Sequence, residues 1–123
     1  MQSVIVKDFI KENELKDCLI VFFKGSSISY FNLVKGDQSK EVLFEYIPLQ
    51  GDFKFELCLY TDIVFSIEDL SVFICKHFTT EVLISDNSIN PYSWILIANT
   101  GRVGKVNQVV REDDFFLIEK PKM

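Results

Sequence analysis

The sequence is short of the residues on which most enzymes depend. It has one histidine, His77, and three widely spaced cysteines, Cys18, Cys58 and Cys75. Histidine is the usual proton carrier near neutral pH, and zinc sites usually show close pairs of cysteine or histidine ligands. Cys75 and His77 are two residues apart on a predicted helix, so they point in different directions. We therefore expect no metal, no cofactor and no enzymatic activity.

A glycine-rich phosphate loop is also missing. The segment from Gly101 to Lys105 reads GRVGK, but a P-loop needs four residues between its glycines and a Ser or Thr after the lysine. We interpret this segment as a hairpin turn. No serine stands in a nucleophile elbow, and the paired carboxylates, such as Asp113 and Asp114, are adjacent residues of turns or helix starts.

Signals for export or membrane insertion are lacking as well. The longest apolar run, Cys18–Phe23, is far shorter than the roughly 18 to 20 residues of a membrane span. The residues after Met1 do not form a basic region followed by an apolar core, as a secretory signal would. An odd number of cysteines flanked by apolar residues favours buried free thiols. We expect a cytoplasmic protein that does not associate with membranes.

The chain contains enough apolar residues to form a packed core. Its 123 residues are 48% hydrophobic and include twelve phenylalanines. This length suits one domain, and this composition is far from that of disordered chains. We expect residues 1–123 to form a single domain.

The first third of the chain predicts a helix and two strands. Residues 8–16 carry apolar side chains on one side of a charged helix. The continuous apolar run of residues 18–23 is typical of a central strand buried on both faces. A turn at 25–27 leads to a return strand at 28–34, and another turn follows at 36–39.

Residues 41–47 and 53–61 alternate between apolar and polar side chains around a glycine-containing turn, which predicts a β-hairpin. Two registers keep their apolar faces aligned. One places Glu45 opposite Lys54, a favourable pair, and the other places Glu45 opposite Glu56, an unfavourable one. Both registers remain open. The acidic side chains on the outward face are those of Glu41, Glu45 and Glu56.

The strongest helix signal covers residues 66–78. Ser66 is a suitable N-cap, and acidic residues follow it in the first turn. The remaining chain predicts four strands, at residues 81–85, 92–98, 103–110 and 115–119. The order of elements indicates an α+β fold, with a mostly antiparallel sheet of about six to eight strands and two helices on one face.

The net charge of −5 is unevenly distributed. Residues 37–69 contain two lysines against eight acidic residues, so this third alone carries −6. A solvated outer face is one interpretation, and an acidic surface that meets a basic partner is the other. No basic stripe is present, so we expect no direct binding of nucleic acid.

Two aromatic residues, Tyr92 and Trp94, lie on one face of a predicted strand. We assign Trp94 to the core. Tyr92 stands at the start of the strand, where it is a candidate anchor for a partner, because tyrosine is common at binding hot spots.

In length, acidity, element order and missing chemistry, the chain resembles the small immunity proteins of bacterial contact-dependent or polymorphic toxin systems. The resemblance rests on no motif, so it assigns no residue. It implies an inhibitor that binds and neutralises a cognate protein toxin, often a basic nuclease. The candidate contacts, chosen from the charge distribution together with Tyr92, are Glu41, Glu45, Glu56, Asp62, Glu68, Asp69 and Tyr92.

Two other functions remain open. One is a phage or mobile-element inhibitor of a host protein, which would rely on the same acidic surface and differ only in its target. The other is a small ligand-binding or enzymatic α+β domain with a pocket in its phenylalanine-rich core. A cavity with convergent polar groups would favour the latter, and a flat acidic face would favour an inhibitor.

Overall fold

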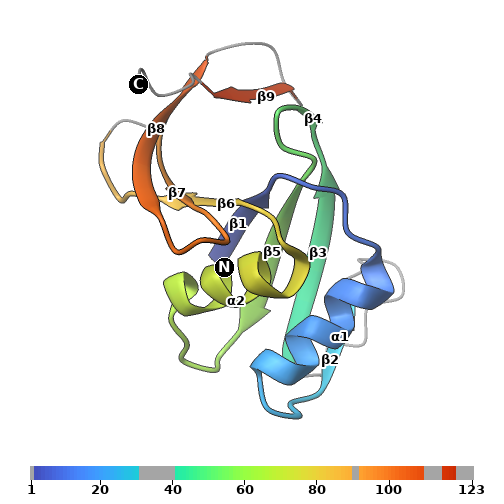
Figure 1. The fold of residues 1–123 in the computed structure, drawn as a ribbon. Helices are drawn as coiled ribbons and strands as arrows, with labels where there is room; N and C mark the ends of the chain where they lie inside the picture. The colour runs from blue at the N-terminus through green and yellow to red at the C-terminus, as the bar shows by residue number, and fades with distance from the viewer. Residues whose placement is uncertain (1, 31–40, 90–91, 110–114, 119–123) are drawn as a thin grey trace.

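A computed structural model describes residues 2–30, 41–89, 92–109 and 115–118, which contain two helices and nine strands (Figure 1). The helices are α1 (Glu12–Phe22) and α2 (Ile67–Phe78). The strands are β1 (Gln2–Val6), β2 (Ile28–Tyr30), β3 (Val42–Pro48), β4 (Gln50–Gly51), β5 (Phe55–Thr61), β6 (Val82–Ser85), β7 (Ser93–Ile97), β8 (Val103–Val109) and β9 (Phe115–Ile118).

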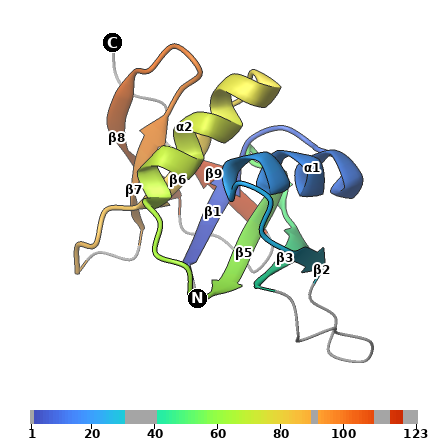
Figure 2. The ribbon, with the colours of Figure 1, turned by 90° about the horizontal axis from the view of Figure 1, so that it is seen from below.

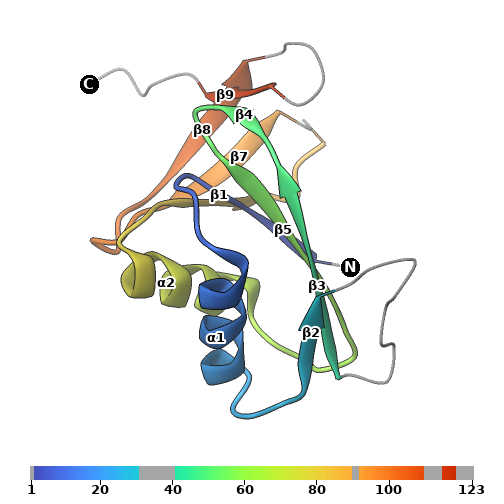
Figure 3. The same ribbon diagram turned by 90° about the vertical axis from the view of Figure 1, so that its right-hand side faces the viewer.

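The strands join in the order β2-β3-β5-β1-β6-β7-β8-β9-β4. Neighbours are antiparallel, except that β2 pairs parallel with β3 and β4 pairs parallel with β9. Both helices lie on one side of β1, β3 and β5, as Figure 2 shows from below and Figure 3 from the side. The predicted α+β fold with a mostly antiparallel sheet is therefore confirmed. The described strands slightly outnumber the expected six to eight, because the two-residue strand β4 is one of them.

The first helix begins later and extends further than predicted. The predicted helix at 8–16 is present with shifted bounds, and the strand at 18–23 was wrong, because α1 spans Glu12–Phe22. A continuous apolar run is compatible with a buried strand or a helix, and here Val21 is 61% exposed on the outer side of the helix. The fully buried side chains follow the i, i+3, i+4 spacing of one helical face. They are Leu15, Cys18 and Leu19.

Strand β1 was not predicted, although it lies in the middle of the sheet. It pairs with β5 along its whole length, from Gln2 opposite Leu59 to Val6 opposite Phe55. It pairs with β6 only at Ile5 and Val6. The two strands separate beyond these two residues, and this fork opens a pocket.

The predicted hairpin is formed by β3 and β5, but neither expected register is right. Glu45 lies opposite Cys58, and Ile47 lies opposite Glu56. The reason is the hairpin tip, where the backbone N–H of Leu49 donates to the carbonyl of Lys54 at 2.8 Å and closes a longer loop. Phe53, expected to lie in the second strand, belongs to this loop.

The second helix forms as predicted. The hydroxyl of Ser66 accepts a 3.2 Å hydrogen bond from the backbone N–H of Asp69, which satisfies one of the free donors at the helix start. Thr79 ends the helix in a left-handed conformation. The buried face of α2 includes Leu70, Ile74 and Cys75.

Two apolar clusters fill the molecule. The larger cluster lies between the helices and the sheet and includes Phe44, Phe55 and Leu57. The smaller cluster comprises four buried side chains with Leu49, Trp94, Leu96 and Ile118 packed against them. The four buried members are Ile5, Phe53, Leu83 and Val106.

The sheet curls around the smaller cluster (Figure 1). Strand β4, at the tip of the β3–β5 hairpin, pairs with β9 at Gln50 and Gly51. The carboxylate of Asp52 accepts a 3.0 Å hydrogen bond from the backbone N–H of Ile118, which adds a second link between the tip and β9. The core prediction for Trp94 agrees with its packing against this cluster.

Several expected features lie outside the described residues, in whole or in part. They are the end of the strand at 28–34, the turn at 36–39, the acidic turn at 112–114 and the C-terminal tail at 120–123. Within the described ranges, neither helix has the length and apolar character needed to cross a membrane.

Candidate protein-binding surface

The structure separates the seven predicted contact residues into four groups. Glu45 and Glu56 lie on the face of the sheet away from the helices, since they share the parity of Ile5, which packs in the smaller cluster. Glu41 and Asp62 form a second group at the end of the hairpin. Glu68 and Asp69 form a third at the start of α2, and Tyr92 stands alone at the start of β7.

On the sheet face, Glu45 has a fixed position. The hydroxyl of Tyr60 donates a 3.0 Å hydrogen bond to Oε1 of Glu45. Partial burial, with this hydrogen bond, raises the pKa of Tyr60. Glu56 lies two residues from Cys58, on the same face of the strand, and Glu45 lies opposite Cys58, so the two carboxylates flank the Cys58 thiol. A preset pair of negative charges is suited to meeting cationic groups of another molecule.

The Cys58 thiol has no activating group beside it. Burial raises its pKa to about 11, and the charges of Glu56 and Glu45 add to the effect. Burial likewise raises the pKa of Cys18 to about 12 and that of Cys75 to about 11. A nucleophilic cysteine needs a lowered pKa and access to solvent. All three thiols are buried and free, as predicted.

At the end of the hairpin, Thr61 holds two segments together. Its hydroxyl donates to the carbonyl of Glu41 at 2.8 Å and accepts from the backbone N–H of Ile63 at 3.0 Å. The backbone N–H of Glu41 in turn donates to the Ser27 hydroxyl at 2.9 Å. The exposed carboxylates of Glu41 and Asp62 therefore extend from a well-anchored strand end.

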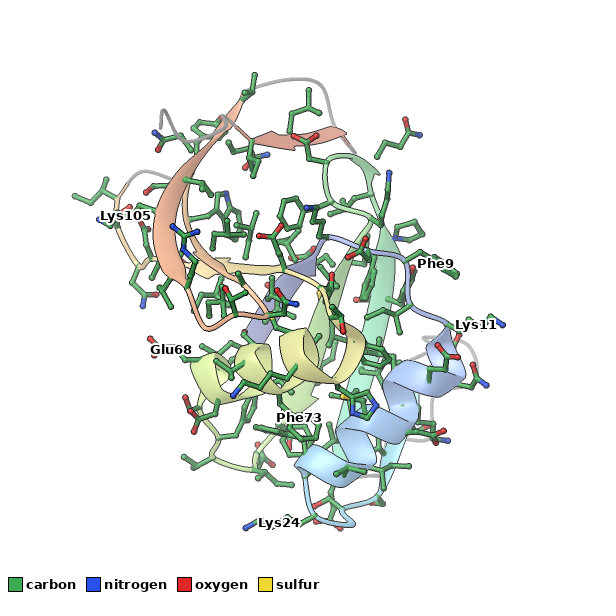
Figure 4. The ribbon with its side chains drawn as sticks, viewed as in Figure 1. Phe9, Lys11, Lys24, Glu68, Phe73 and Lys105 are labelled. Atoms are coloured by element: carbon green, nitrogen blue, oxygen red, sulfur yellow. The ribbon has the colours of Figure 1, made fainter. Side chains whose placement is uncertain are left out.

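At the start of α2, Glu68 and Asp69 are exposed in the first turn. Negative charge is favourable there because it faces the positive end of the helix dipole. Figure 4 shows Glu68 beside this first turn. The two carboxylates stabilise the helix and remain open to solvent.

The six predicted acidic contacts form no ion pair with any basic side chain that the structure describes. In the part of the chain that the structure describes, the one ion pair is between Lys7 and Glu81, at 2.7 Å. None of the six predicted acidic contacts takes part in it. Their charge is therefore uncompensated by described residues.

Tyr92 is set apart from the acidic groups on β3 and β5. It is 41% exposed, and its backbone carbonyl accepts a 2.7 Å hydrogen bond from the N–H of Gln108. This bond places it in the β7–β8 hairpin, with β5, β1 and β6 between it and β3 in the sheet. The structure does not bring Tyr92 together with the acidic contacts on β3 and β5.

One exposed feature was not predicted. Val64 lies in the β5–α2 loop and is 97% exposed. It stands in an apolar triplet, Ile63-Val64-Phe65, between Asp62 and Ser66. A hydrophobic triplet between two elements was the signal available in the sequence, because loops of this length are usually polar.

The fork between β1 and β6 opens into a pocket of about 450 Å³. Its walls include the apolar Phe65, Ile67 and Ile84 and the neutral polar Gln2 and Asn87. None of the described lining residues carries an acid or base with a pKa near neutrality. The pocket is large enough to hold a small molecule.

The remaining candidate for chemistry, His77, packs between aromatic rings. Its ring stacks on Phe73 at 5.8 Å and contacts Phe78 edge-on at 4.7 Å. Within the described ranges, no three His, Cys, Asp or Glu residues are grouped so as to hold a metal ion. The position of His77 in the last turn of α2 suits the helix dipole.

Comparison with known proteins identified no relative of this chain. No protein-family model matches the chain, and no curated protein or solved structure does so either.

Proposed function

We propose that this chain is an immunity-type inhibitor that binds and neutralises a basic protein toxin, with a nuclease as the leading class. The observation that carries the proposal is the pair of carboxylates on the sheet face, Glu45 and Glu56. Four more predicted carboxylates lie in separate groups, at the end of the hairpin and at the start of α2, and none of the six forms an ion pair with a described basic side chain.

The sheet face that carries Glu45 and Glu56 is suited to fast recognition of a cationic partner. Clustered charge of one sign accelerates association and selects partners by charge. Glu45 is already held by Tyr60, so less side-chain freedom is lost when it meets a Lys or Arg. The surface therefore combines long-range attraction with a preset contact.

The proposal is tested by capturing the tagged protein from its native cells and measuring association with the recovered basic partner. The double variant E45K/E56K should slow association by about tenfold at low salt and weaken its salt dependence. The matched control is E12K/E14K, which makes the same change in net charge on α1. Equal slowing in both variants, or in neither, would remove the sheet face from the interface.

A second function, small-ligand binding, is favoured by the pocket at the β1–β6 fork. Its mixed apolar and neutral polar lining matches an uncharged ligand. Native mass spectrometry of the protein from its own cells tests this function. A bound small molecule, lost when Ile84→Trp fills the pocket, would support it, and a bare mass would count against it.

A further inference from the structure

The β5–α2 loop presents an apolar side chain to solvent at a fixed position. Val64 is 97% exposed, while its neighbours Ile63 and Phe65 pack against the larger core. A fully exposed valine between two anchored apolar residues loses little freedom on binding. It therefore has the properties of a contact point.

Hydrogen bonds hold the loop at both ends. At its start, the Thr61 hydroxyl accepts from the backbone N–H of Ile63 at 3.0 Å. At its end, the Ser66 hydroxyl accepts from the N–H of Asp69 at 3.2 Å. The position of Val64 is thus set before any partner arrives.

A groove of about 330 Å³ lies between this loop and the end of α1. Its walls are aromatic: the rings of Phe23 and Phe65 are 5.2 Å apart, and those of Phe22 and Phe65 are 6.3 Å apart, both edge-on. Such a groove can accept one aromatic or large aliphatic side chain.

Acidic residues lie at the groove and beside its loop. Asp69 lines it, and the exposed Asp62 and Glu68 stand beside the same loop. None of the three forms an ion pair within the described residues. Lys24 is the one basic residue among the described lining residues, and Figure 4 shows it extending from the turn after α1. The acidic residues at the groove and beside its loop therefore favour a cationic partner, and the positive charge of Lys24 opposes such a partner.

We infer that the groove and Val64 form the centre of a docking surface for a cationic segment that carries one bulky apolar side chain. This inference rests on the proposed function and specifies its partner: the apolar side chain enters the aromatic groove, and flanking Lys or Arg residues meet Asp62, Glu68 and Asp69. An apolar centre with a charged rim is the usual arrangement of a binding hot spot.

The test is an NMR titration of the isotope-labelled full chain with the capped peptide Lys-Lys-Trp-Lys-Lys. Amide shifts should concentrate at residues 22–24 and 62–69. They should vanish with the peptide Lys-Lys-Ser-Lys-Lys, which lacks the apolar group, and with Glu-Glu-Trp-Glu-Glu, which reverses the charge. Shifts centred on Glu45 and Glu56, or the absence of shifts, would overturn the inference.

Three variants of the chain test the same docking surface. V64S should weaken peptide binding by about fivefold, since exposed apolar contacts at a hot spot have effects of this size. I89S is its matched control, because Ile89 is as exposed but lies in another loop, and should bind like the unaltered chain. K24Q should strengthen binding by about twofold, because it removes the opposing charge. Equal effects of V64S and I89S would count against the groove.

The captured native partner separates this inference from the proposed function. A basic partner that binds V64S as tightly as the unaltered chain would overturn the docking surface and leave the proposed function standing. Peptide binding at the groove without any basic protein in the capture would overturn the proposed function and support the docking surface.

Discussion

Ser66 fixes the start of α2 through its hydroxyl, which accepts the backbone N–H of Asp69. Replacing it by alanine, S66A, should lower the free energy of unfolding by about 1 kcal/mol, because the N–H loses its partner. The matched variant S66G should cost only a few tenths of a kcal/mol, since glycine is accepted at N-caps. Urea denaturation measures both. Equal stability of S66A and the unaltered chain would show that the cap contributes nothing.

This residue also shows what the sequence could reveal about single positions. Ser66 stands three residues before an acidic residue, at the start of an apolar helical pattern. This local signal correctly predicted the N-cap of α2. The exposure of Val64 is different. The apolar triplet of residues 63–65 marks the loop, but it does not show which of its three side chains faces solvent, because that depends on where the end of α1 lies relative to the loop.

At the scale of elements, two connections are joined by side chains. The Thr80 hydroxyl donates to the Asp8 carboxylate at 2.6 Å and accepts from its backbone N–H at 3.3 Å. The Lys7–Glu81 ion pair lies beside it. Together they tie the segment between β1 and α1 to the segment between α2 and β6.

Removing the buried hydroxyl should loosen this connection. T80V keeps the volume of a side chain that is 2% exposed but leaves the Asp8 groups without their partner, so we expect a loss of about 1–3 kcal/mol. The control T100V changes an exposed threonine in the β7–β8 turn and should stay within about 0.5 kcal/mol. Guanidinium denaturation compares them, and similar losses in both would argue against the connection.

Elements with a distinctive local pattern were predictable, and others were not. Alternation identified β3 and β5, and capping with helical spacing identified α2. The run at 18–23 was misassigned because continuous hydrophobicity does not distinguish a buried strand from a helix. The hairpin register failed because it depends on the loop that carries Phe53 into the smaller cluster.

At the scale of the whole molecule, stability should fall in alkaline solution. Burial raises the pKa of Cys18 to about 12 and those of Cys58 and Cys75 to about 11, above the ordinary value of 9. Folding therefore favours the protonated thiols. Their contribution is complete below pH 9 and is lost as the pH rises toward the folded values.

We expect a loss of about 1 kcal/mol per thiol by pH 10. Urea denaturation at pH 7, 9 and 10 measures this decline. The variant C58A has one titrating thiol fewer, so its stability should decline less steeply over the same range. Identical slopes for C58A and the unaltered chain would contradict the role of Cys58.

The closed shape of the sheet was beyond sequence analysis. The fold class followed from the order of elements, but the pairing of β4 with β9 involves two-residue contacts between distant segments. Strands this short show no alternation. The candidate acidic residues were found from charge alone, whereas their division into separate groups depends on this three-dimensional arrangement.

That closure has a consequence for how the chain folds. Residues 50–51 meet residues 115–116, so the contact forms only after a long loop has been closed, and contacts of this kind are slow. Until then, Ile5, Leu83 and Phe53 lack the cover of β9. We therefore expect folding to end with a late closing step, and the open sheet that precedes it to be the species most prone to self-association.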